Sequence, residues 1–133
     1  MPCRAIVMST HIDFYKQGLL LYGQGRNEEA IEVLRKALEL KPDWIDVLHT
    51  IATAQSKLGR HDEALATITR VIDLDPADPF AYTSQSIFLQ RKGLVPEAEA
   101  AAAKARMAAW KKELKTNPNA PPPGPAGGMS VVQ

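Results

Sequence analysis

The sequence predicts an all-α fold, an α-solenoid of three antiparallel helix pairs with an extended C-terminal capping helix. Three classes of residue recur at one spacing of 34 positions, which is typical of tandem structural repeats. The recurring residues are the glycines Gly25, Gly59 and Gly93, the alanines Ala30, Ala64 and Ala98, and the prolines Pro42 and Pro76. Because each class has its own role in a helix pair, the shared spacing predicts one two-helix unit repeated along the chain.

The helix ends follow from the turn residues. Each recurring glycine comes after an apolar-periodic segment, where glycine adopts the left-handed conformation that ends a helix at low cost. Acidic residues then open the second helix, because the helix dipole favours them there. The pattern predicts helices over residues 11–24, 27–40, 43–58, 61–74, 79–92 and 95–115.

Two first helices carry specific capping signals. Thr10, followed three residues later by Asp13, predicts a capping box. Asp78 and Pro79 predict an N-cap and a first helical residue. The loops are only a few residues long, so consecutive helices must lie antiparallel, and each pair needs a neighbour to cover its apolar side.

This pattern resembles the tetratricopeptide repeat, a 34-residue helix pair with the signature Trp-x2-Leu-Gly-x2-Tyr, then Ala-x3-Phe, then Pro. The first repeat reads Phe14-x2-Gln17-Gly18-x2-Leu21, Ala30-x3-Leu34 and Pro42; the second reads Leu48-x2-Ile51-Ala52-x2-Gln55, Ala64-x3-Ile68 and Pro76; the third reads Tyr82-x2-Gln85-Ser86-x2-Leu89 and Ala98-x3-Ala102. The small residues at the Gly18 and Ala30 positions let helix backbones approach closely. Trp110 stands where a third proline would fall, so we expect the last helix to run on toward Lys115.

The domain organisation follows from these repeats. We expect a flexible N-terminus over residues 1–10, a three-repeat domain over 11–115 (repeats 11–44, 45–78 and 79–112) and a disordered tail over 116–133. The tail holds five prolines and three glycines in 18 residues, a composition that does not form a packed core.

Composition excludes several classes of function. The net charge of +1 gives no global field toward nucleic acid or membrane, and the single cysteine, Cys3, excludes an intramolecular disulfide. No uncharged apolar run of about 18 residues is present, so we expect a cytoplasmic protein without a membrane span. His11, His49 and His61 share no face at metal spacing, and no phosphate loop or nucleophile elbow occurs. We therefore expect no enzyme activity, catalytic residue, metal or cofactor.

The resemblance implies that the first helices of the repeats line a concave groove that holds a peptide. Helical spacing places nine residues on that side: Ile12, Tyr15, Leu19, Tyr22, His49, Thr53, Phe80, Thr83 and Ile87. For Tyr15, Tyr22 and Phe80, a packing or capping role is an equally good interpretation.

Some family members clamp a C-terminal carboxylate with basic and amide side chains on the groove face. The corresponding residues here are Tyr15, Leu19, Thr50, Phe80 and Ser84, none of which is basic. A terminal carboxylate would find no charged donor, so an apolar internal segment is the favoured ligand.

The sequence therefore predicts a non-catalytic protein-interaction module, an adaptor or assembly scaffold. The alternatives are a holding or secretion-type chaperone for apolar segments and, more remotely, RNA binding through the basic last helix. That helix carries Lys104, Arg106, Lys111, Lys112 and Lys115, although a solvated cap face is the stronger interpretation of these charges. Its eight alanines also allow self-association, or need no explanation beyond helix propensity.

Overall fold

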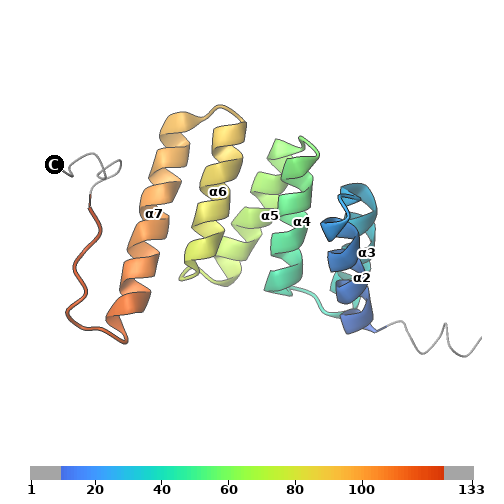
Figure 1. Ribbon diagram of the computed structural model, residues 1–133, viewed down its shortest axis with the longest axis horizontal. Helices are drawn as coiled ribbons and strands as arrows, with labels where there is room; N and C mark the ends of the chain where they lie inside the picture. The colour runs from blue at the N-terminus through green and yellow to red at the C-terminus, as the bar shows by residue number, and fades with distance from the viewer. Residues whose placement is uncertain (1–9, 125–133) are drawn as a thin grey trace, which may run out of the picture. The chain divides into compact units, whose positions relative to one another are not determined.

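The computed structural model describes residues 10–124, and this range contains six helices and no strand (Figure 1). The helices are α2 (His11–Gly23), α3 (Asn27–Leu40), α4 (Ile45–Lys57), α5 (His61–Leu74), α6 (Pro79–Arg91) and α7 (Val95–Leu114). These bounds agree with the predicted ones to within two residues, so the all-α fold is confirmed. Most of the predicted flexible N-terminus and the second half of the predicted tail lie outside the described residues.

The chain forms two compact units, Met1–Thr67 and Ile68–Gln133, whose boundary lies within α5. We refer to them as the N-terminal unit and the C-terminal unit and describe each by itself. In the N-terminal unit α2 packs on α3, α3 packs on α4, and α2 also touches α4. The buried cluster at their centre consists of Ile31, Leu34, Ala37, Val47, Ile51 and Ala54.

Helices α2 and α3 approach each other closely at Gly18. A Cβ atom at Gly18 would lie 2.5 Å from Cγ of Leu34, a side chain that is fully buried. The sequence predicted a small residue at this position because the helix backbones meet there. The atoms that a larger residue would meet belong to the Leu34 side chain rather than to the backbone of α3.

The C-terminal unit is built on the pairing of α6 with α7. Ala98, Ala101 and Ala105 on α7 are buried, and so are Ala81 and Phe88 on α6. At the Gly18-equivalent position of α6, the Ser86 hydroxyl donates a hydrogen bond of 2.8 Å to the carbonyl of Ala98. A small polar residue therefore joins the two helices where a larger one would separate them.

The predicted helix ends are confirmed. Gly25, Gly59 and Gly93 have φ values of +81°, +81° and +89°, so each adopts the left-handed conformation. At the start of α2, the amide of Asp13 donates to Thr10 Oγ1 at 3.1 Å, and the Thr10 amide donates to Asp13 Oδ2 at 3.3 Å. This is the predicted capping box.

The start of α4 differs from the prediction. Asp43 has a φ of +62°, and among residues 10–124 it is the one non-glycine residue with a positive φ. A residue in that conformation cannot belong to a right-handed helix, so α4 begins at Ile45 with Trp44 as its N-cap, two residues later than expected. Aspartate tolerates this region better than most side chains.

Two arginines at equivalent repeat positions, 34 residues apart, make different ion pairs in the N-terminal unit. Arg26 pairs with Glu29 of its own helix start at 2.6 Å. Arg60 pairs instead with Glu28, which lies in the preceding repeat. Both pairs are solvent-exposed and contribute little stability on their own.

The segment that follows α7 contacts that helix at one point. The indole Nε1–H of Trp110 donates a hydrogen bond of 3.0 Å to the carbonyl of Ala120, and Ala120 is only 6% exposed. The first part of the Pro/Gly-rich tail therefore returns to α7 and is anchored there. The composition of the tail could not reveal this single contact.

Candidate functional site

Two of the predicted groove residues on α2 are available to a ligand. Ile12 and Leu19 are 48% and 39% exposed. They are seven residues apart, so they lie on one side of the helix, two turns from each other. Exposed aliphatic side chains repeated on one helix face form an apolar strip on the N-terminal unit.

The two predicted site tyrosines on α2 are each partly covered by neighbouring side chains. Tyr15 and Tyr22 are half-buried and pack against the core of the N-terminal unit. The Tyr15 ring lies 4.7 Å from that of Trp44, and the ammonium group of Lys57 lies 4.6 Å from the Tyr22 ring. Burial, and secondarily the Asp46 carboxylate, raises the pKa of Tyr15 above its ordinary value. Both tyrosines thus support the strip from one edge while keeping part of each ring exposed.

On α4, the predicted site residues His49 and Thr53 are half-buried. The Thr53 hydroxyl donates to the carbonyl of His49 at 3.0 Å, so its proton is used within the helix. The clamp-equivalent Thr50 does the same toward the carbonyl of Asp46, also at 3.0 Å. These contacts leave α4 with hydroxyl acceptors rather than donors for a ligand.

The sequence did not single out Trp44, which organises one end of this face. Its ring meets that of His11 edge-on at 5.5 Å, and the Lys41 ammonium lies 4.6 Å from its centroid. The sequence placed Trp44 inside a helix expected to start at residue 43, so no local signal identified it as the residue before α4. The arrangement fixes the N-terminal end of α2 against the start of α4.

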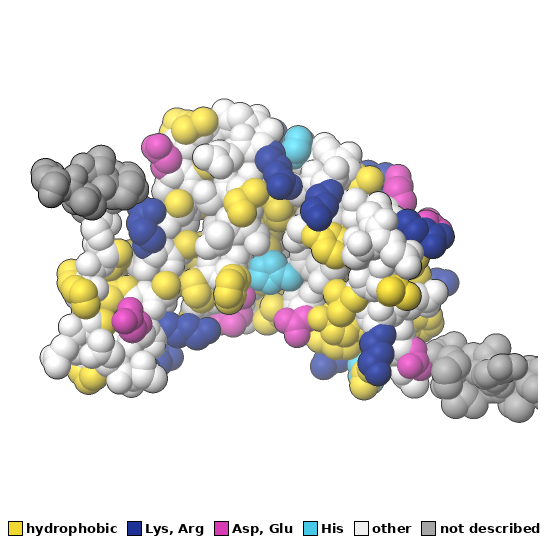
Figure 2. Space-filling view, viewed as in Figure 1, with side chains coloured by type: hydrophobic (Ala, Val, Ile, Leu, Met, Phe, Trp, Pro, Cys, Tyr) yellow, Lys and Arg dark blue, Asp and Glu magenta, His cyan; other side chains and the backbone are white. Residues whose placement is uncertain are grey.

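In the C-terminal unit, the predicted residues lie on α6. Phe80 is 73% exposed and Ile87, two turns along, is 41% exposed. Thr83 lies between them, and its hydroxyl donates to the carbonyl of Pro79 at 3.1 Å. Figure 2 shows exposed apolar side chains among charged ones on the face of the molecule that it views. Phe80 is too exposed to act as a packing residue within the described part of the chain.

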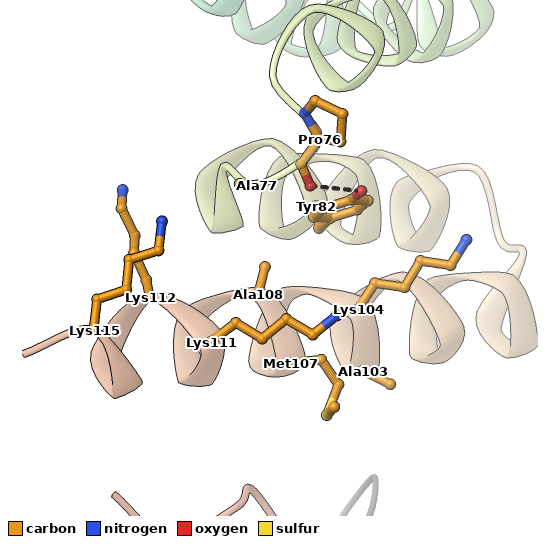
Figure 3. Close-up of a pocket in the computed structure, with 10 residues that line it drawn as sticks. All are labelled: Pro76, Ala77, Tyr82, Ala103, Lys104, Met107, Ala108, Lys111, Lys112 and Lys115. Carbon is orange, nitrogen blue, oxygen red and sulfur yellow. Dashed lines mark hydrogen bonds between the residues drawn. The ribbon is translucent and has the colours of Figure 1, made fainter. Parts of the chain in front are cut away.

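The C-terminal unit also contains a cleft of about 470 Å³ that the sequence did not predict (Figure 3). Pro76 and Ala77 come from the turn before α6, Tyr82 comes from α6, and the other lining residues come from α7: Ala103, Lys104, Met107, Ala108, Lys111, Lys112 and Lys115. The Tyr82 hydroxyl donates to the carbonyl of Pro76 at 3.0 Å, which holds the turn against α6. The basic residues of the last helix thus border a hollow rather than a flat face.

Within residues 10–124, no group of three or more His, Cys, Asp or Glu side chains is placed to hold a metal ion. Among the helices described, none combines the length and apolarity needed to cross a membrane.

Comparison with known proteins places this architecture in a family. The sequence profile of the tetratricopeptide repeat matches residues 21–84. The chain is therefore similar to this family over 64 of its 133 residues. This repeat is a protein-interaction fold that is generally non-catalytic.

Among curated relatives, the tetratricopeptide repeat chain is 26% identical over 102 residues to "Photosystem I assembly protein Ycf3" of Synechococcus sp. (strain WH7803). The match covers 74% of this chain and 58% of the relative, so the chain spans little more than half of that protein's length.

Solved structures show the α-solenoid fold. A crystal structure of MamA is 24% identical with a TM-score of 0.74, covering 80% of this chain and 62% of that one. The Yersinia enterocolitica type III secretion translocator chaperone SycD is 21% identical with a TM-score of 0.72, covering 80% of this chain and 81% of that one.

Proposed function

We propose that this tetratricopeptide repeat chain is a non-catalytic adaptor or assembly scaffold that binds an apolar internal segment of another protein on its first helices. The observation that supports this most is the apolar strip of Ile12 and Leu19 on α2, which stays exposed although the helix buries its other side against α3. Exposed apolar surface that is continuous over several residues often marks a protein-interaction site. The relative named as a photosystem I assembly protein gives the scaffold role further support.

The apolar side chains of the strip favour an apolar ligand. Ile12 and Leu19 offer only aliphatic surface, and Tyr15 and Tyr22 add ring edges. The clamp-equivalent positions Tyr15, Leu19 and Thr50 in this unit hold no cation that could pair with a terminal carboxylate. On α6, Phe80 and Ile87 present the same kind of surface in the C-terminal unit. We therefore expect a ligand anchored by apolar side chains rather than by charge.

The test begins with a phage-displayed library of random dodecapeptides selected on the full chain. The selected peptides should share apolar anchors, and their Kd values can then be measured by fluorescence anisotropy. In the Ile12→Ser/Leu19→Ser variant, two exposed anchors become polar, so binding should weaken about tenfold or more. Raising the salt from about 0.05 to 0.5 M should change the Kd by less than about twofold, because no ion pair is involved.

Leu40→Ser is the matched control. Leu40 is 55% exposed on α3 of the same unit, so the substitution removes a similar apolar surface away from the strip. It should leave the Kd within about twofold of the unchanged chain. Equal weakening by Leu40→Ser, or no weakening by the double variant, would show that the strip is not the binding site.

The same selection separates the scaffold from the chaperone alternative. A scaffold binds a narrow set of related peptides, whereas a holding chaperone binds unrelated apolar peptides with similar Kd values. The likeness to SycD, named as a secretion chaperone, is a likeness of fold. Selected peptides without a common pattern would therefore replace the scaffold proposal with a chaperone.

A further inference from the structure

The cleft in the C-terminal unit has an apolar floor. Ala103, Met107 and Ala108 come from α7, and Tyr82 comes from α6. In Figure 3 Ala108 points toward the Tyr82 ring, whereas Met107 and Ala103 lie on the side of α7 that faces away from it. Met107 is 40% exposed, so its side chain is accessible to a ligand. The cleft has a volume of about 470 Å³, which lies within the range of sites that hold a small ligand or a few side chains.

The edge of the cleft carries only positive charge. Lys104, Lys111 and Lys115 follow one face of α7 at intervals of seven and four residues, and Lys112 lies beside them. In Figure 3 the Lys111 side chain extends along α7 toward Lys104, while Lys112 and Lys115 project from the C-terminal end of the helix. Their alkyl stems add to the apolar surface and leave the ammonium groups at the edge.

These charges are not neutralised by the part of the chain that the structure describes. No carboxylate lines the cleft, and within residues 10–124 none of the four lysines makes an ion pair. The acidic residues of the adjacent turn form hydrogen bonds with backbone amides instead. The Asp75 carboxylate accepts a hydrogen bond from the amide of Ala77 at 3.3 Å, and the Asp78 carboxylate accepts one from the amide of Phe80 at 2.9 Å. Four like charges around an apolar hollow call for an anionic partner with an apolar part.

We propose that this cleft is a second binding site, which binds an acidic segment of a partner protein. An apolar side chain of that segment would contact Met107 and Ala108, and its carboxylates would pair with the lysines. This site goes beyond the apolar strip on α2, because it lies in the other unit and uses charge. Peptide is favoured over nucleic acid because the cleft offers one aromatic ring, Tyr82, and its hydroxyl is already bonded to Pro76. It is favoured over a lipid surface because the apolar part is recessed rather than projecting.

The probe is a synthetic peptide in which Leu-Phe is flanked on each side by Glu-Asp, and its twin has Gln-Asn in place of each acidic pair. Binding to the full chain is followed by anisotropy and by amide NMR shifts. We expect the acidic peptide alone to shift the amides of Ala77, Met107 and Ala108. Its Kd should rise about fivefold in Lys104→Gln/Lys111→Gln, from the loss of two exposed ion pairs, and should rise with salt.

The matched control is Lys16→Gln/Arg35→Gln, which removes two exposed positive charges from the N-terminal unit and gives the same net charge. It should leave the Kd within about twofold. Met107→Ser should weaken the acidic peptide about threefold without changing the net charge.

Four outcomes would overturn the proposal: equal binding of the uncharged twin, equal weakening by the control pair, NMR shifts outside the cleft, and tighter binding of either a uridine dodecamer or phosphatidylglycerol vesicles. Ile12→Ser/Leu19→Ser should leave the acidic peptide's Kd unchanged. Failure of this site is therefore distinguishable from failure of the apolar strip.

Discussion

The contact between Gly18 and Leu34 predicts the sign of a substitution that helix propensity alone would get wrong. In a helix interior, replacing glycine with alanine stabilises by about 1 kcal/mol, because alanine loses less backbone freedom. At Gly18 the new Cβ would lie 2.5 Å from Cγ of Leu34, far inside van der Waals contact. Leu34 is fully buried, and overpacking of a buried side chain costs about 1–3 kcal/mol.

We therefore expect Gly18→Ala to lower the free energy of unfolding of the N-terminal unit by about 1 kcal/mol, the overpacking cost less the propensity gain. Gly23→Ala is the control, because no heavy atom lies within 4 Å of a Cβ at that position in the same helix. It should stabilise by up to about 1 kcal/mol. The two variants should thus differ by about 2 kcal/mol.

Urea unfolding in a Trp110→Phe background measures this difference, because Trp44 then reports on the N-terminal unit as the only tryptophan of the chain. Adding Leu34→Val to Gly18→Ala removes a methylene at the point of contact and should recover about 1 kcal/mol relative to additivity. If Gly18→Ala is as stable as Gly23→Ala, the close approach does not limit this position and the reasoning is refuted.

Three further substitutions test single hydrogen bonds. Thr67→Val removes the hydroxyl that donates at 2.8 Å to the side chain of Gln55, which is 4% exposed, and should lower the unfolding free energy by about 1–2 kcal/mol in urea titration. Asp78→Ala removes the N-cap of α6 and should cost about 1 kcal/mol, whereas Asp78→Asn should cost much less. Trp110→Phe removes the donor to Ala120, so amide exchange after α7 should accelerate while that of the Ala98 and Ala101 amides stays slow; unchanged exchange after α7 would contradict the anchoring role.

The sequence predicted the fold well because its turns are determined locally. Gly25, Gly59 and Gly93 are needed where φ is positive, and Thr10 caps α2 through atoms three residues away. Such signals act within one turn of chain and can be read without tertiary knowledge. Asp43 was missed because an aspartate is compatible with several conformations, and only the path into α4 requires the left-handed one.

The candidate sites were less predictable, because helical spacing tells which residues share a face and not how far a neighbour covers it. Ile12 and Leu19 are exposed as expected, yet Tyr15 is partly covered by Trp44. The cleft beside Met107 depends on how α7 packs against α6 and the turn before it, which no local pattern encodes.

The different partners of Arg26 and Arg60 have a consequence for how such a chain can lengthen. The same residue at the same repeat position uses a glutamate of its own helix in the first repeat and one from the preceding repeat in the second. A tandem duplication would therefore supply each internal copy with a ready inter-repeat partner, while the outermost copy keeps a local one. Growth of the array by copying then requires no compensating substitution at this position.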